Sequence, residues 1–119
     1  MSVNSVRENE QKIIRIDLYF DDGDFVTLDK LIDYDIDLTK REIGYIEITS
    51  AFNNSELFSR FCSSTDNVTK IYFTMNAIVG KDDAYGVIML CDMYIKSLVL
   101  NGSIDTASEM VLRLEGMVK

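Results

Sequence analysis

Apolar residues recur at every second position over much of this 119-residue chain. The clearest example is the segment LIDYDIDLTK, residues 31–40, in which one parity holds Ile32, Tyr34, Ile36 and Leu38. A repeat of two places successive side chains on opposite faces of a β-strand, whereas an amphipathic helix needs apolar residues three and four positions apart. The repeat therefore predicts half-buried strands, and here the apolar parity is expected to pack on a hydrophobic core.

The same repeat predicts strands in six further segments, separated by breaks rich in glycine, aspartate, asparagine and serine. These segments are KIIRIDLYF (12–20), FVTL (25–28), IGYIEITS (43–50), KIYFTMNAIV (70–79), YGVIMLCDMYIKSLVL (85–100) and EMVLRLEGMVK (109–119). The turn sequence DDGD, residues 21–24, predicts that the first two form a hairpin. In the fifth segment both parities are apolar around Val87 to Cys91, which predicts a strand covered on both faces.

One segment, NNSELFSRFCSS, departs from the repeat of two. Its apolar residues Leu57, Phe58, Phe61 and Cys62 stand at helical spacing, after residues that serve well as N-caps. A short α-helix over Ser55–Ser63 is therefore predicted.

About seven strands and one short α-helix, with no regular alternation of the two, predict a mainly β fold. The expected architecture is an antiparallel β-sandwich or a partly closed barrel. We expect residues 1–11 to be a flexible N-terminal arm and residues 12–119 to be a single β-sandwich domain. The core is expected to contain Ile14, Ile16, Leu18, Ile36, Leu57, Phe61, Phe73, Met89, Leu98, Leu112 and Leu114.

Catalytic and metal-binding motifs are missing from the sequence. Without histidine, serine–histidine and cysteine–histidine catalysis is impossible and a zinc site loses its commonest ligand. Cys62 and Cys91 stand among apolar residues, which predicts small core residues rather than catalytic thiols. The acidic turn at residues 21–24 fails as a calcium loop because its twelfth position is Ile32 instead of glutamate. We therefore expect no enzymatic activity, no cofactor and no bound metal.

The formal net charge of −8 argues against a basic patch for nucleic acid or for an anionic membrane. No apolar run approaches the roughly 20 residues that span a bilayer, and the polar N-terminal sequence lacks the apolar segment of a signal peptide. We expect a cytoplasmic protein with no membrane association and no specific binding of nucleic acid.

Asp33, Asp35 and Asp37 occupy the polar parity of residues 31–40. On a strand they would project from one face about 7 Å apart, and neighbouring carboxylates would repel by a fraction of a kcal/mol. Glu47 and Asp17 lie on outward parities of other strands and are expected to extend this acidic face. The face is interpreted either as a solvated surface or as one that repels or imitates nucleic acid.

The C-terminal third of the chain has a pattern of its own: an apolar strand, a small polar turn and a last alternating strand. Its pattern residues are Ile95, Leu98 and Leu100, the turn Asn101, Gly102 and Ser103, and then Met110, Leu112 and Leu114. This pattern, over about 35 residues, resembles the closing segment of phage tail-tube proteins and their relatives in other contractile injection machines.

The resemblance implies a structural virion protein that forms a homohexameric ring by joining subunit sheets edge to edge. Stacked rings would make a tube for DNA, built with other virion proteins in the host cytoplasm. Asp33, Asp35, Asp37 and Glu47 would then line an acidic lumen, because carboxylates repel phosphate and keep DNA from adhering.

Two other classes of function stay open. A small acidic inhibitor of the anti-restriction or anti-CRISPR type would imitate nucleic acid and bind a basic nucleic-acid-binding enzyme. Another virion component, such as a tail adaptor, a terminator or a capsid decoration protein, could use the same fold. Mass in solution separates the first class from a tube subunit, since an inhibitor should be a monomer or dimer.

Overall fold

The computed structural model describes residues 2–3, 12–51, 67–76, 84–101 and 109–119. In these ranges the chain forms one antiparallel sheet, which confirms the mainly β prediction. The predicted helix Ser55–Ser63, with the core candidates Leu57 and Phe61, lies outside the described residues, as does most of the predicted arm. The strands are β1 (Ser2–Val3), β2 (Lys12–Phe20), β3 (Phe25–Leu28), β4 (Leu31–Asp37), β5 (Gly44–Ala51), β6 (Val68–Asn76), β7 (Ala84–Asn101) and β8 (Glu109–Val118), with a 3-10 turn, η1 (Arg41–Ile43), before β5.

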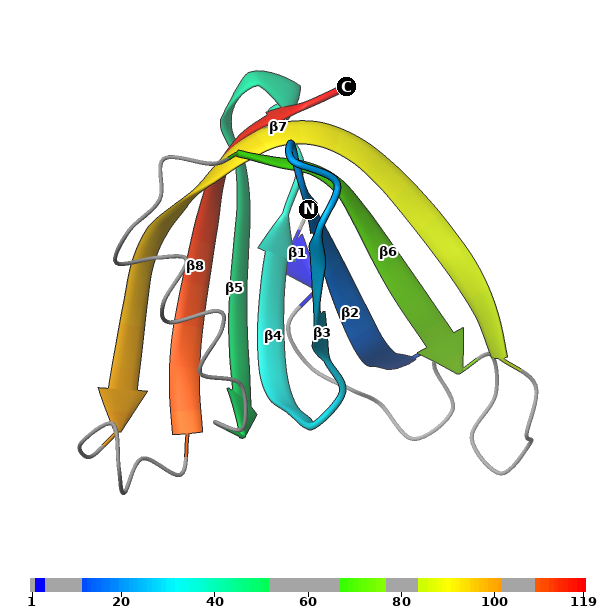
Figure 1. The fold of residues 1–119 in the computed structure, drawn as a ribbon, viewed down its shortest axis with the longest axis vertical. Coiled ribbons are helices and arrows are strands. Elements are labelled where there is room, and N and C mark those ends of the chain that lie inside the picture. Colours follow the sequence, from blue (N-terminus) through cyan, green and yellow to red (C-terminus); the bar gives the residue numbers. More distant parts are fainter. Residues whose placement is uncertain (1, 4–11, 52–66, 77–83, 102–108) are drawn as a thin grey trace.

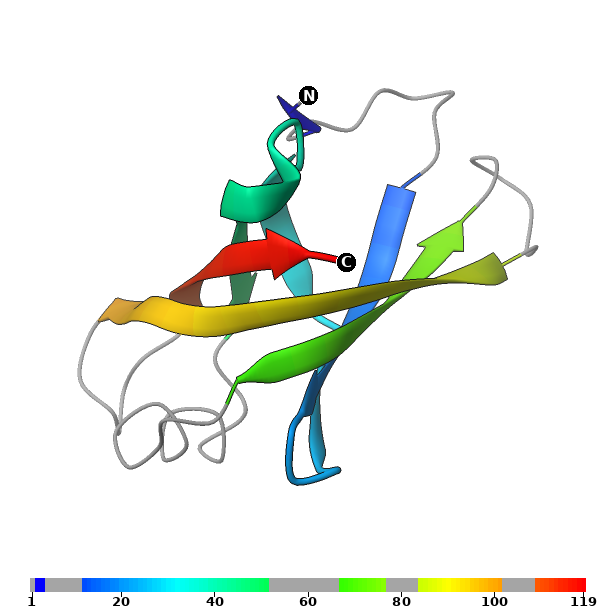
Figure 2. The same ribbon diagram turned by 90° about the horizontal axis from the view of Figure 1, so that it is seen from above.

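The strand order is β1-β4-β5-β8-β7-β6-β2-β3, and the sheet folds over along β7. This 18-residue strand pairs with β6 through its first half and with β8 through its second half. Figure 1 shows β7 arching over the other strands, and Figure 2 shows it running the width of the molecule. Near the two ends of the sheet order, Ile13 N–H of β2 donates to the Tyr34 hydroxyl of β4 at 3.3 Å. The sheet is thus a partly closed, two-layered barrel.

The hydrophobic core lies between the two layers and draws one parity from each. The predicted hairpin is confirmed, since β2 and β3 pair with Ile16 opposite Leu28. Met89 and Leu98 are partly buried and pack against the core. The fully buried large side chains are Ile16, Leu18, Val26, Leu28, Ile46, Ile48, Ile71, Met93, Met110, Leu112 and Leu114.

Two predicted core residues, Ile14 and Ile32, are exposed instead. Each lies at a shift of register: the pairing of β2 with β6 skips from Ile13 to Arg15, and that of β4 with β5 skips from Leu31 to Asp33. A bulge adds one residue to a strand and so exchanges the inward and outward parities on one side of it. Ile13, rather than Ile14, is therefore buried.

The prediction that β7 is covered on both faces is wrong for its first half. Val87, Ile88 and Leu90 are all substantially exposed. An apolar run occurs in strands that are buried between two layers and also in strands that extend past a neighbouring strand. The second case applies here, because β8 pairs with β7 only from Cys91 onward. The surplus of apolar residues therefore marks an exposed part of the strand.

Candidate acidic face

Asp33, Asp35 and Asp37 project from the outward face of β4, while Tyr34 and Ile36 between them are buried. Glu47 lies on the same side of the sheet, directly opposite Asp35 on the neighbouring strand β5. The four candidate residues are therefore brought together on one outward face. Asp33 is exposed, and the other three are partly exposed.

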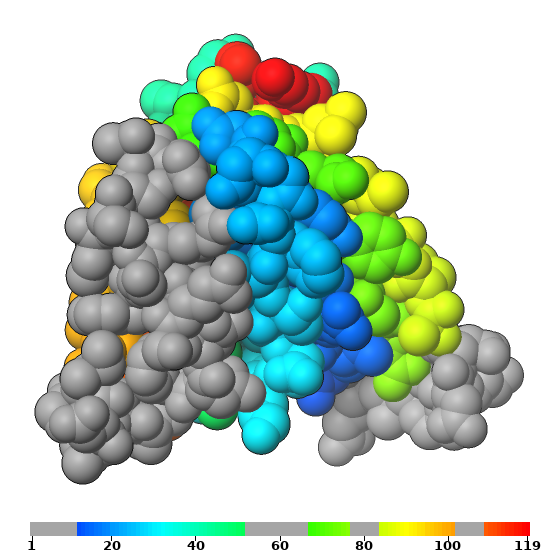
Figure 3. Space-filling view, in the orientation of Figure 1, coloured from blue at the N-terminus to red at the C-terminus, as the bar shows by residue number. Residues whose placement is uncertain are grey.

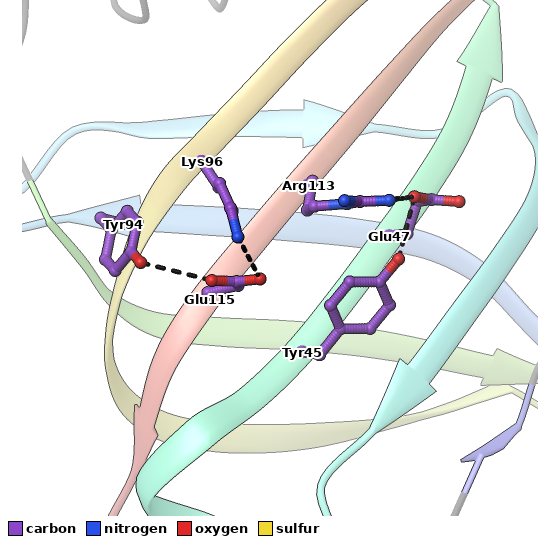
Figure 4. Close-up of polar contacts among 6 residues, drawn as sticks. All are labelled: Tyr45, Glu47, Tyr94, Lys96, Arg113 and Glu115. Atoms are coloured by element: carbon purple, nitrogen blue, oxygen red, sulfur yellow. Dashed lines mark hydrogen bonds and ion pairs between the residues drawn. The ribbon is translucent and has the colours of Figure 1, made fainter.

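Glu47 is held by two partners that were not predicted from the sequence, Arg113 and Tyr45. Arg113 stands directly opposite on β8 and donates from Nη2 and Nε to the same oxygen, Oε2, at 2.7 and 3.2 Å. The Tyr45 hydroxyl donates to that oxygen at 2.9 Å, and the guanidinium lies 5.2 Å from the centre of the Tyr45 ring. Figure 4 shows this group of three on β5 and β8. Glu47 is thus a paired carboxylate.

A second group of similar composition lies beside the first. Glu115 of β8 accepts from Lys96 Nζ at 3.0 Å and from the Tyr94 hydroxyl at 3.3 Å, both on β7 (Figure 4). Lys96 reaches this face at a bulge, because the pairing of β7 with β8 skips from Ile95 to Ser97. Each of the two groups thus consists of one tyrosine, one carboxylate and one cation.

The pKa values of this face follow from these contacts. The hydrogen bonds from Arg113, and then from Tyr45, lower the pKa of Glu47. Burial, followed by the hydrogen bond to Glu47, raises the pKa of Tyr45. Hydrogen bonds from the Thr39 hydroxyl and backbone N–H, at 2.5 and 3.1 Å, lower the pKa of Asp37. The lowered pKa values keep Glu47 and Asp37 ionised near neutral pH, and the raised pKa keeps Tyr45 protonated there.

Carboxylates outnumber cations on this face. Arg113 and Lys96 are the two cations on β4, β5, β8 and the second half of β7. The carboxylates on these strand segments are Asp33, Asp35, Asp37, Glu47, Asp92, Glu109 and Glu115. We refer to the outward surface of these strands as the acidic face.

The expectation that Asp17 extends the acidic face is wrong. Asp17 lies on β2, which the order of the sheet separates from β4 by four strands. The residue is only 5% exposed, because its side chain is enclosed by Arg15, whose Nε lies 3.2 Å away, and by Thr27, whose hydroxyl donates at 2.5 Å. Asp17 is thus part of a separate polar contact between β2 and β3.

The described residues hold no cluster of three or more histidine, cysteine, aspartate or glutamate side chains that could bind a metal ion. Cys91 is a small core residue, as predicted: it is buried and its Sγ lies 3.3 Å from Val68 O. Burial raises the pKa of its thiol to about 11. Among the residues that the structure describes, no helix has the length and apolar character to cross a membrane.

Comparison with known proteins adds no relative. The chain matches no protein-family model, no curated protein and no solved structure. Function is therefore inferred from the fold and from the acidic face.

Proposed function

We propose that this protein is a structural virion protein, a tail-tube-like subunit that forms a ring with an acidic lumen for DNA passage. The observation that supports this function is the placement of Asp33, Asp35 and Asp37 in one outward row on β4. The row stands on a strand whose inward residues, Tyr34 and Ile36, are buried in the core. Its geometry is therefore repeated faithfully in every copy of a ring.

A ring turns a short row of carboxylates into a continuous negative wall. Phosphate groups are repelled by such a wall. The repulsion is strongest at low ionic strength, because salt at 0.1 M largely screens the interaction between exposed charges that are more than about 10 Å apart. The paired groups around Glu47 and Glu115 add rigid polar surface beside the row. DNA could then pass through the lumen without adhering to it.

The test replaces the row and records assembly and DNA retention. Changing Asp33, Asp35 and Asp37 together to Asn should leave the fold and the rings intact, since asparagine keeps the size of each side chain and a hydrogen-bond acceptor, and ion pairs at the protein surface add little to stability. Changing all three to Lys should still give rings, but these should retain DNA in a manner that weakens with salt. Negative-stain images and co-sedimentation with DNA provide the two measurements.

A matched control makes the same change of charge, three aspartates to lysine, at another place in the chain. Asp21, Asp22 and Asp24 lie in the hairpin turn between β2 and β3, and the strand order separates β2 from β4 by four strands; their change to Lys alters the net charge equally. This variant should retain much less DNA than the variant of the row. Wild-type protein that forms no ring would contradict the proposal, and so would equal DNA retention by the two Lys variants.

The regular spacing of the row also supports a second candidate, a small acidic inhibitor that occupies the nucleic-acid site of a basic enzyme. Carboxylates about 7 Å apart along an exposed strand offer such an enzyme a series of negative charges. The Asn variant separates the candidates, because an inhibitor would fold normally and lose its target. A tube subunit would keep its assembly.

A further inference from the structure

One edge of the first half of β7 has no partner strand among the described residues, and we refer to it as the open edge. β6 pairs along one side of it, from Ala84 to Met93. On the other side β8 pairs only from Cys91 onward, and the last bond there is donated by Lys119 N–H to Leu90 O at 3.0 Å. No described residue pairs with this side of the strand between Ala84 and Met89. In Figure 3 this part of β7, in yellow-green, lies at the right-hand margin of the molecule next to β6.

The backbone groups at this edge can be assigned from the register. Leu90 O points toward β8, and in a strand every second residue directs its N–H and C=O to the same side. The pairing of β7 with β6 is unbroken from Leu90 to Ala84. The N–H and C=O groups of Ala84, Gly86 and Ile88 therefore point to the open edge.

The side chains at this edge are apolar and exposed. Exposure is 38% for Tyr85 and 44% for Val87 on one face, and 59% for Ile88 and 55% for Leu90 on the other. Residues 84–91 include neither a charged residue nor proline. Natural sheets block their edges with lysine, proline or bulges, and an edge that has none of them is suited to pairing with another strand.

The second half of β7 provides a contrast within the same strand. There β6 no longer runs alongside, but the segment carries Lys96 and a bulge between Ile95 and Ser97. These are two of the devices that discourage strand addition. The chain thus blocks one half of β7 and leaves the other half suited to pairing.

We propose that two copies of this chain pair through the open edges of β7, as antiparallel strands related by a two-fold axis at Gly86. In this register Gly86 faces Gly86 of the second copy, and Ile88 faces Ala84 of the second copy. On the other face Tyr85 stands across from Val87 of the second copy. The edge is complementary to itself, since a large residue meets a small one and an aromatic residue meets a β-branched one, which is a favourable cross-strand pair.

Three features of the structure suit this partner. The paired segment ends where Ile88 meets Ala84, which leaves Leu90 free to keep its bond from Lys119. The Tyr72 hydroxyl and the ring carbons next to it fill the space beside Gly86 where a Cβ would lie, so the centre of the contact is covered without a side chain at residue 86. β5 and β8 separate the acidic row on β4 from β7, so two copies of net charge −8 meet along an uncharged edge.

This contact goes beyond the proposed function. A two-fold contact uses the same patch on both copies and joins them in pairs, whereas ring closure needs a contact between two different patches. Rings whose subunits also pair in this way would have dihedral symmetry. The contact can form whether or not Asp33, Asp35 and Asp37 line a lumen.

The main test uses charge at Val87, because residue 87 of each copy lies diagonally across the two-fold axis from residue 87 of the other. Val87→Lys and Val87→Glu should each raise the dissociation constant of the pair about tenfold or more, and mixing the two variants should restore it. Val99→Lys, at a similarly exposed position in the second half of β7, is the control and should leave pairing unchanged. Mass in solution over a wide range of concentration is the measurement.

Hydrogen exchange of the unmodified chain gives a second test that does not depend on a variant's folding. The amides of Gly86 and Ile88 should become protected as concentration rises and pairs form, whereas the amide of Val87, already directed toward β6, should not change. A chain without pairs at any concentration would overturn the proposal. So would pairs in which the amides of Gly86 and Ile88 stay exposed, or variants that fail to restore each other when mixed.

Discussion

Ile48 of β5 and Ile88 of β7 are the same residue in the same kind of antiparallel strand, yet Ile48 is fully buried and Ile88 is 59% exposed. β5 has β4 on one side and β8 on the other, and its inward face lies on the core. The first half of β7 has β6 alone among the described strands. Alternation in sequence thus assigns residues to two faces, whereas the neighbouring strands determine whether either face is covered.

Truncation of these two isoleucines should give the largest contrast. Ile48→Ala should lower the free energy of unfolding by about 2–5 kcal/mol, because it opens a cavity in the core. Ile88→Ala should cost less than about 0.5 kcal/mol in the unpaired chain, as expected at an exposed position. Urea unfolding at a concentration where the chain is a monomer provides the measurement. Similar losses of stability for the two variants would contradict the difference in burial between Ile48 and Ile88.

The junction of β8 with the bend of β7 should give the next largest effect. Gly116 has a φ of +147°, and a Cβ there would contact the backbone at Asp92 O and, at 2.7 Å, Met93 Cα. Gly116→Ala should therefore cost about 1–3 kcal/mol of stability through backbone strain. Met117→Ala, at an exposed neighbour, is the matched control and should change stability little. Equal melting temperatures for the two variants would show that β8 can shift away from β7.

The ion pair on the acidic face should have a smaller effect than either of these. A double-mutant cycle with Glu47→Gln and Arg113→Gln should give a favourable coupling, because two guanidinium N–H groups bind one carboxylate oxygen. The coupling should weaken in 1 M salt, where the screening length falls to about 3 Å. The same cycle on Glu115 and Lys96 should give a weaker coupling, since one ammonium donor makes that ion pair. A stronger coupling for the lysine pair would contradict this ranking.

The pH dependence should be the smallest effect. The pKa of Glu47 is lowered from its ordinary value of 4.5 in the folded chain, so its stabilising contribution is present above pH 4.5 and is lost as pH falls through the lowered value. The pKa of Tyr45 is raised from 10.0, so its contribution is present below pH 10 and is lost as pH rises further. Unfolding between pH 3 and 6, as measured in urea, should depend on pH less steeply for Glu47→Gln than for the wild-type chain.

Much of the strand pattern could be predicted from the sequence, because alternation is a local property. The strands around Tyr34, Glu47 and Leu112 have the faces that were expected. Ile14 and Ile32 were misplaced because a bulge is decided by the partner strand and not by the residues beside it. The sequence predicts that the first half of β7 is covered on both faces, because an apolar run does not indicate which strands lie beside it.

Some features of the candidate site could likewise be predicted from the sequence, and others could not. Asp33, Asp35 and Asp37 share a strand, so their common face follows from spacing alone. Arg113 is 66 residues from Glu47, and only the register of β5 with β8 sets one opposite the other. Asp17 was grouped with the row by parity, but strand order places it on the other half of the sheet.

The amino-acid pattern is enough to predict a β-rich, acidic chain without histidine, with one apolar and one polar parity in most strands. Those properties depend on residue type and on the geometry of an extended backbone, which repeats every two residues. The order of the strands, the bulges, the partner of Glu47 and the open edge of β7 emerge from the three-dimensional fold. These depend on contacts between residues far apart in the chain, because a strand acquires its neighbours, and hence its burial, only when the whole sheet has assembled.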